Sequence, residues 1–275
     1  SGFWPATSSC TPVTLAFCGM RIFTSAETGT SSRKGPFIII GLVRLTRCAV
    51  MDPSCFQSAT STTLPGELTS ASGASFSADE SRLLSSSNQT GIWNAYSMPG
   101  GGGEWTAVTQ STTDNNYAVA FFPADDRVLI TRDEGGNELN HLYVIQADGT
   151  EKDLTPGENL KADFLGFTAD GSAFHVMSNE RDPKFFDVYR YDATSYERTR
   201  VYENEDGLEP SAVSLDGKWL ALGQSNTTND SDLHVVELAT GKATKVSAHE
   251  GQAQFTAQDF SPDGQWLYYT ANDQG

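Results

Sequence analysis

The hydrophobic and polar positions of the chain repeat from residue 75 onward. In each repeat an apolar residue leads into a Ser/Thr/Pro-x-Asp-Gly/Asp turn, and a short run of β-forming residues follows. The repeated segments are SFSADESRLL (75–84), FFPADDRVLI (121–130), GFTADGSAF (166–174), AVSLDGKWLAL (212–222) and DFSPDGQWLYY (259–269). Their turn aspartates, spaced by 46, 45, 46 and 47 residues, are Asp79, Asp125, Asp170, Asp216 and Asp263. A period of this size is typical of solenoids, propellers and other arrays.

Each period predicts four strands. The Asp-Gly turn suits a hairpin between the first two, because the carboxylate accepts local backbone N–H groups and glycine tolerates a positive φ. A longer polar loop then leads to a third strand, at Trp93–Met98, His141–Ile145, Phe186–Tyr191 and Leu233–Leu238, and a fourth strand ends near Thr109, Thr155, Tyr202 or Ser247. We therefore predict an all-β, incomplete β-propeller of four-stranded antiparallel blades. Four complete blades cover residues 75–247, and the start of a fifth covers residues 255–275.

The first 50 residues differ from the repeats. They carry five cationic residues and one acidic residue, a net charge of 5 − 1 = +4. Because the whole chain has a net charge of −17, the remaining residues carry −17 − 4 = −21. All four cysteines lie before residue 56. We expect residues 1–50 to be disordered or to lie upstream of a true start at Met51, and residues 51–74 to be a linker or a degenerate first strand. We expect residues 75–275 to form the partial propeller.

The apolar run over residues 37–43 is too short to span a bilayer. A secretory signal is a less favoured interpretation of that run and of the cationic pair Arg33 and Lys34 before it. The compartment stays open, with the cytoplasm slightly favoured.

Charge and residue spacing exclude several classes of partner. A net charge of −17 and a pI near 4.5 argue against nucleic acid or an anionic membrane, because phosphate binding needs clustered Lys and Arg. The cysteines fit neither a zinc nor a thioredoxin motif, and no histidine spacing suggests a metal site. We expect no metal and no cofactor. The four histidines, for which packing or surface roles are expected, are His141, His175, His234 and His249.

Longer stretches of the repeats carry a family resemblance. They are SSSNQTG (85–91), TRDEGGNELNHLY (131–143), KDLTPGEN (152–159), SNERDPKFFDVYRYD (178–192) and VYEN (201–204). Over about residues 75–275 the chain resembles the propeller of bacterial prolyl oligopeptidase family serine peptidases. The Ser-Pro-Asp-Gly of residues 261–264 is shared with TolB-like propellers, whereas no period has the Gly-His and Trp-Asp pairs of WD repeats.

The resemblance implies a parent enzyme in which the propeller lies over an α/β-hydrolase domain with a Ser-Asp-His triad and admits only short peptides. Its implied partners are that missing C-terminal hydrolase domain and a peptide substrate. This chain has no Gly-x-Ser-x-Gly nucleophile elbow, since the segments 29–33 and 73–77 both lack the final glycine. We therefore assign no catalytic residue and expect the chain alone to be inactive.

Because neighbouring strands of a blade run in opposite directions, the loops between second and third strands of all blades lie at one rim. Loops on a rigid scaffold are where binding residues tend to lie. The candidate substrate or domain-contact residues are Glu134, Asn137, Glu138, Glu180, Arg181 and Asp182. They suit a peptide amine, with Arg181 suited to a carboxylate or carbonyl. The stronger interpretation is that they stabilise their own loops by local turns and ion pairs. The turn aspartates, present in every blade, are expected to be architectural.

Three functions remain open from the sequence. The first is the gating and substrate-selecting propeller of a serine peptidase. The second is a TolB-like, non-enzymatic propeller that binds a protein or peptide. The third is an incomplete reading frame with no activity of its own.

Overall fold

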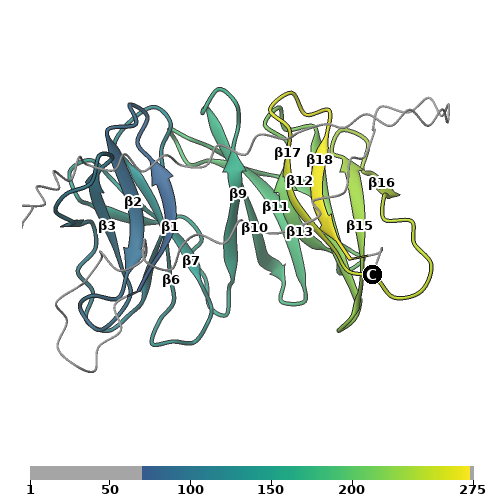
Figure 1. The fold of residues 1–275 in the computed structure, drawn as a ribbon, viewed down its shortest axis with the longest axis horizontal. Coiled ribbons are helices and arrows are strands. Elements are labelled where there is room, and N and C mark those ends of the chain that lie inside the picture. Colours follow the sequence, from purple (N-terminus) through teal and green to yellow (C-terminus); the bar gives the residue numbers. More distant parts are fainter. Residues whose placement is uncertain (1–69, 273–275) are drawn as a thin grey trace, which may run out of the picture. The chain divides into compact units, whose positions relative to one another are not determined.

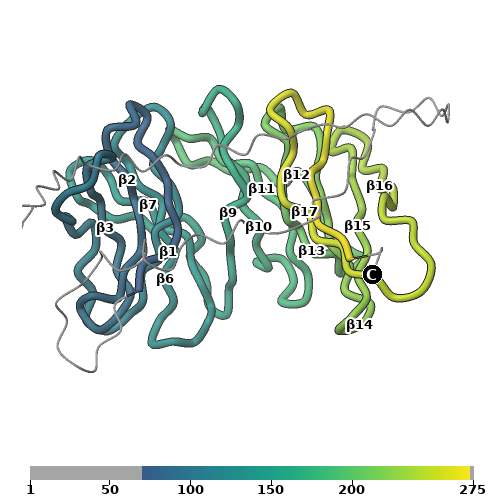
Figure 2. Tube along the Cα trace, viewed as in Figure 1, coloured from purple at the N-terminus to yellow at the C-terminus, as the bar shows by residue number. Residues whose placement is uncertain are grey.

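The computed structural model describes residues 70–272, all of which lie in the unit Pro36–Gly275. These residues form eighteen β-strands and no helix. The strands make five antiparallel sheets that follow one another along the chain, and we call them blades 1 to 5 (Figure 1). In Figure 2 the trace passes from one blade to the next without returning to an earlier one.

Blade 1 consists of β1 (Ala71–Phe76), β2 (Arg82–Ser87), β3 (Asn94–Pro99) and β4 (Thr106–Ala107). Blade 2 consists of β5 (Asn116–Phe121), β6 (Val128–Arg132), β7 (His141–Ile145) and β8 (Glu151–Asp153). Blade 3 consists of β9 (Ala162–Phe167), β10 (Ala173–Asp182), β11 (Phe185–Asp192) and β12 (Arg198–Tyr202). Blade 4 consists of β13 (Glu209–Val213), β14 (Trp219–Thr227), β15 (Asp230–Glu237) and β16 (Lys242–Lys245). Blade 5 has two strands, β17 (Phe255–Phe260) and β18 (Leu267–Ala271).

The predicted propeller of four complete blades and the start of a fifth is confirmed, since each strand pairs with the next in chain order. Strand β1 begins at Ala71, so the expected boundary at residue 75 falls inside the first strand. Residues 71–74 belong to the blade because their backbone pairs with the end of β2, as in Ala71 opposite Ser87. The expectations for residues 1–50 and for residues 51–69 lie outside the described residues.

The hydrophobic clusters lie between blades. Between blades 2 and 3, the cluster includes Leu129, Leu142 and Val144 from one sheet and Phe174, Val176 and Tyr191 from the other. Leu84 meets Ile130 between blades 1 and 2, Val188 meets Leu220 between blades 3 and 4, and Val235 meets Leu267 between blades 4 and 5. Blades 2, 3 and 4 thus bury both faces against their neighbours, which is how a propeller makes a core from separate sheets.

Every first strand carries a β-bulge. The pairing with the second strand shifts between residues 72 and 75 in β1, 118 and 120 in β5, 164 and 166 in β9, 210 and 212 in β13, and 257 and 259 in β17. A bulge adds one unpaired residue and increases the local twist of the strand. The first strands also contact one another from blade to blade, as β1 with β5 and β13 with β17 do. The repeated bulge therefore shapes the strand on which successive blades meet.

The turns between first and second strands share a hydrogen-bond pattern in blades 1, 3, 4 and 5. A Ser or Thr hydroxyl donates to the carboxylate two residues later, as Ser77 does to Asp79 and Thr168 to Asp170, both at 2.7 Å. The same carboxylates accept the backbone N–H two residues further on, at 3.1 Å from Ser81 and 3.0 Å from Ser172. These bonds favour the charged form and lower the pKa of Asp79 and of Asp170 to about 2.

Blade 2 builds its turn differently. Its closing bond runs from Phe122 N–H to the Arg127 carbonyl, whereas in blade 4 the equivalent bond runs from Ser214 to Trp219. Ala124 therefore occupies the position of the other aspartates, and Asp125 occupies the position that glycine has in blades 3, 4 and 5. The cause is Phe122, whose buried ring belongs to the core between blades 2 and 3 and takes the place of the hydroxyl residue. Asp125 instead binds the Arg127 guanidinium, with 2.8 Å between Oδ1 and Nε.

A buried hydroxyl ties the third strand to the segment that follows the fourth strand. We call this contact the hydroxyl clamp. The acceptors are Thr109, Thr155 and Ser247, whose oxygens receive the backbone N–H of Ala95, Leu142 and Leu233, each at 2.9 Å. In blade 3 the bond runs the other way, since the side chain of Asp187 on the third strand accepts the N–H of Asn204, which follows the fourth strand, at 2.9 Å. In the sequence Thr109, Thr155 and Ser247 stand out only as the ends of predicted strands.

Candidate functional site: the loop rim and the opposite face

The connections between strands lie at the two ends of each blade. The loops from second to third strand and the links between blades share one end, which we call the loop face. The turns from first to second and from third to fourth strand share the other end, the turn face. This division follows from the chain-order antiparallel pairing of each sheet. The six candidate rim residues all lie toward the loop face.

The loop between β6 and β7 carries Glu134, Asn137 and Glu138, and all three are exposed. Its backbone needs three left-handed residues, Gly135, Gly136 and Glu138, the last with φ 61°. The Asn137 side chain accepts the Leu139 N–H at 2.9 Å and so stabilises the turn. Within residues 70–272, neither glutamate carboxylate makes a hydrogen bond or ion pair. The loop therefore offers two free negative charges on a locally braced backbone.

A third carboxylate lies beneath this loop. Asp133 is 6% exposed, and its Oδ1 is a buried oxygen that has no hydrogen-bond partner among the described residues. Burial raises the pKa of the neighbouring Tyr117, and the charge of Asp133 raises it further. The Tyr117 ring lies 5.8 Å from the Trp93 ring, measured between centroids. An orphaned buried acceptor of this kind calls for an explanation, which an ordered water or a ligand donor would supply.

Arg181 is committed to an internal ion pair. It lies on the extended end of β10, where only residues 183 and 184 separate β10 from β11, so the long polar loop expected here is a tight hairpin. Its Nε and Nη2 lie 2.6 and 2.9 Å from the two oxygens of Asp187, and Nη2 also donates to the Asn204 carbonyl at 2.7 Å. The Asp187 side chain is fully buried. This geometry favours the stabilising interpretation of Arg181 over substrate binding.

The two neighbours of Arg181 are also engaged. Glu180 pairs with Arg198 at 2.7 Å across blade 3, and the Asp182 carboxylate accepts the Lys184 N–H at 2.9 Å. The structure therefore divides the six candidates into two groups. Those of blade 3 are bound to other residues of blade 3, and the glutamates of blade 2 remain open to solvent.

The histidines occupy separate environments. His141 contacts Asp153 at 3.0 Å, His234 contacts Gln224 at 3.0 Å, and His249 contacts Asp232 at 3.2 Å. His175 is 2% exposed, and burial, aided by the charge of Arg190, lowers its pKa to about 4. It is therefore neutral at physiological pH. Among the described residues, no three His, Cys, Asp or Glu side chains are grouped as a metal site would require.

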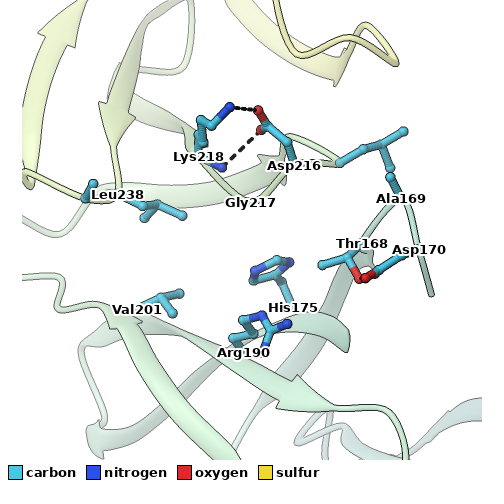
Figure 3. Close-up of a pocket in the computed structure, with 12 residues that line it drawn as sticks. Thr168, Ala169, Asp170, His175, Arg190, Val201, Asp216, Gly217, Lys218 and Leu238 are labelled. Carbon is cyan, nitrogen blue, oxygen red and sulfur yellow. Dashed lines mark hydrogen bonds and ion pairs between the residues drawn. The ribbon is translucent and has the colours of Figure 1, made fainter. Parts of the chain in front are cut away.

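A cavity of about 660 Å³ opens on the turn face between blades 3 and 4. Figure 3 shows His175 and Arg190 on one side of it, with Asp216, Gly217 and Lys218 opposite. Val201 and Leu238 form part of the apolar wall. A second hollow of about 510 Å³ lies on the loop face between blades 4 and 5, lined by residues such as Thr227 and Gln254. Residues 70–272 contain no helix that is long and apolar enough to cross a membrane.

Comparison with known proteins points to peptidases and to other propellers. The chain is 26% identical to dipeptidyl aminopeptidase BIII of Pseudoxanthomonas mexicana, over 57% of this chain and 30% of that protein. The chain thus spans less than a third of the length of this relative. No family model matches the sequence.

Solved propellers match the fold. TolB of Acinetobacter baumannii has a TM-score of 0.51 and 20% identity, and the match covers 75% of this chain and 55% of TolB. Prolyl oligopeptidase B of Galerina marginata has a TM-score of 0.54 and 10% identity, over 70% of this chain and 28% of that enzyme. At such identities the likeness concerns the fold alone. The resemblance to prolyl oligopeptidase propellers is confirmed by the homology to the aminopeptidase together with these structural matches.

Proposed function

We propose that this chain is the non-catalytic propeller portion of a prolyl oligopeptidase-like serine peptidase and that it selects peptide substrates for a hydrolase domain. The observation that carries the proposal is the homology to an aminopeptidase over the repeats. That relative is more than three times as long as the part matched here, which leaves room for a catalytic domain.

Within this proposal, the β6–β7 loop is the part that contacts the peptide. Glu134 and Glu138 have free carboxylates, and Asp133 has an unpartnered oxygen beneath them. A peptide amino group is cationic and has several N–H donors, so it complements both features. The residues of blade 3, by contrast, hold the scaffold in place.

A second candidate function is a TolB-like propeller that binds a protein or peptide without catalysis. The structural match to TolB of A. baumannii favours it. The gene separates the two possibilities. A reading frame that completes the propeller and then encodes a Gly-x-Ser-x-Gly elbow supports the peptidase, and a frame that ends after the last blade supports the binding protein.

Labelling tests the non-catalytic role at the protein level. The purified chain is incubated with a serine-directed fluorophosphonate probe, beside the complete gene product. We expect the complete product to be labelled and this chain to remain unlabelled, because it has no nucleophile elbow. Specific labelling of this chain would contradict the proposal.

Substitution tests the role of the loop. In the complete gene product, Glu134→Gln combined with Glu138→Gln should lower kcat/KM about tenfold or more for a peptide with a free amine. The same variant should leave kcat/KM unchanged for the N-acetylated peptide. Glu197→Gln, at an exposed position on the turn face, is the matched control. Equal losses for both peptides would remove the amine from the proposal.

A further inference from the structure

One cross-strand pair departs from the repeat. Strands two and three pair Leu84 with Ser97 in blade 1, Leu129 with Val144 in blade 2, and Ala221 with Val235 in blade 4. In blade 3 the same position pairs His175 with Arg190. The pairs of blades 2 and 4 point at the next blade and fill the core there. Blade 3 therefore presents two nitrogen-rich side chains to blade 4 where its neighbours present aliphatic ones.

The change of residues coincides with the cavity on the turn face. His175 and Arg190 both line this space of about 660 Å³, a volume within the range of small-ligand sites. His175 is 98% buried, and Arg190 is exposed at the opening. Figure 3 shows the imidazole and the guanidinium side by side, facing the turn that contains Gly217.

The His175 ring approaches that turn closely. A Cβ placed on Gly217 would lie 3.8 Å from Cε1 and 3.9 Å from Nε2 of the ring. The ring therefore lies against the turn of blade 4 at the inner end of the cavity. Burial and the charge of Arg190 determine its protonation, and no hydrogen bond to a described residue contributes.

The charged groups around the cavity are not equivalent. Asp170 is bound by Thr168 and Ser172 of its own turn, and Asp216 is bound by Ser214 and Lys218. Lys218 lies at the rim, with 70% of its side chain exposed. Among the described residues, Arg190 has no carboxylate within ion-pair distance. Its charge contributes to lowering the pKa of Asp192, but that carboxylate is bound by the backbone N–H groups of Thr194 and Ser195. The cavity therefore offers a guanidinium without an ion pair and an unbonded imidazole, while the carboxylates near it are already satisfied.

The remaining wall is apolar. Val201, Leu215, Leu238 and Ala239 line the cavity, and Leu215 is exposed although it is a large hydrophobic residue. A ligand that fits must combine an anionic group for Arg190 with an aliphatic group for this wall. A guanidinium binds a carboxylate through two parallel hydrogen bonds, and a neighbouring imidazole can donate a third.

We propose that this cavity binds the C-terminal carboxylate of a peptide that ends in an aliphatic residue. The carboxylate lies against Arg190 and His175, and the aliphatic side chain contacts Leu215 and Leu238. The site is on the turn face, at the opposite end of the blades from the β6–β7 loop. It therefore stands independently of the function proposed for that loop.

The test uses the whole chain with ¹³C-labelled histidine and follows the His175 ring by NMR. The probes are N-acetyl-leucine, its uncharged amide, and inorganic phosphate. N-acetyl-leucine should shift the ring signal saturably and raise the pKa of His175 by about one unit or more, because a nearby anion favours imidazolium. The amide and phosphate should bind at least about tenfold more weakly, since each lacks one of the two complementary groups. Equal binding of the amide or of phosphate, or no saturable shift, would overturn the proposal.

Variants assign the binding to this cavity. Arg190→Gln should weaken N-acetyl-leucine binding about tenfold or more, and Arg190 is exposed, so the fold should tolerate the change. Lys242→Gln removes the same charge from an exposed position on β16 and should leave binding unchanged. His175→Leu with Arg190→Val installs the pair of blade 2 and should abolish binding. Unchanged affinity in Arg190→Gln would refute the site even if the double variant failed to fold.

Discussion

At the scale of single residues, Asp187 is the charged side chain whose burial requires the most compensation. It is fully buried, and it is compensated by Arg181, by the Asn204 N–H and by Arg200 at 3.5 Å. Burial alone would raise its pKa, but the hydrogen bonds and the two guanidinium charges hold the pKa below the ordinary value. A buried ion pair contributes little over an apolar pair, whereas breaking it leaves an uncompensated charge.

Arg181→Gln should therefore destabilise the fold clearly more than the loss of an exposed ion pair does, because it removes both bonds to the buried carboxylate and leaves the charge in place. Urea unfolding followed by circular dichroism measures the loss. Lys218→Gln, which disrupts an exposed pair, should change stability by less than about 1 kcal/mol. A similar small change for Arg181→Gln would show that its guanidinium is free to bind something else.

At the scale of elements, the third strand of each complete blade depends on its clamp. Thr155 is fully buried, and its hydroxyl oxygen is the acceptor for the Leu142 N–H. The backbone N–H group has no alternative partner on that side, since the clamp lies beyond the last paired residue of the short β8. A buried donor without an acceptor bears its full desolvation cost.

Thr155→Val keeps the shape of the side chain and removes that acceptor. We expect a loss of about 1–3 kcal/mol, together with faster hydrogen exchange at the Leu142 amide. Thr199→Val, at an exposed position on β12, is the matched control and should have almost no effect. If Thr155→Val were as stable as the parent chain, the clamp would be dispensable.

The same elements show what the sequence could predict. The period and the Asp-Gly turns predict the number of blades and the order of their strands, because each turn is encoded by adjacent residues. The bulges in the first strands have no such local signal, since they arise where a twisted strand meets neighbouring blades. The sequence also did not predict the register of the blade 2 turn. The sequence pattern aligns Asp125 with the other turn aspartates, but the burial of Phe122 places Asp125 one position later in the turn.

The candidate site was harder to predict than the fold. Residues 179–182 read as a polar loop, yet they extend β10, because Asp187 on β11 gives Arg181 a buried partner across the hairpin. The His175–Arg190 pair became visible only when strand pairing aligned the blades with one another. A deviation from a repeat can be recognised only after the structural register of the repeat is known.

At the scale of the whole molecule, stability should depend on pH in two stages. The folded state keeps His175 neutral down to about pH 4, whereas an unfolded histidine takes up a proton near pH 6.5. Falling pH in this interval therefore favours the unfolded state. The pKa values of Asp187 and Asp232 lie below the ordinary value, so their contributions are present above about pH 4 and are lost as the pH falls further.

We expect the free energy of unfolding to fall by about 2 kcal/mol from His175 alone between about pH 7 and about pH 5. Urea unfolding at the two pH values gives the total change, and subtraction of the result for His175→Leu isolates the contribution of this residue. The variant should lose the first stage and keep the acid unfolding that depends on the aspartates. An identical pH dependence in both proteins would contradict this assignment.

The hydrophobic clusters between blades also determine how the chain can be divided. Because every cluster takes residues from two sheets, a single excised blade would expose the hydrophobic side chains that it buries against its neighbours. A pair of adjacent blades is therefore the smallest fragment that keeps one of these clusters intact, and an insertion point for a reporter domain belongs in a hairpin loop. A cut in the link between two blades would separate the two halves of one core.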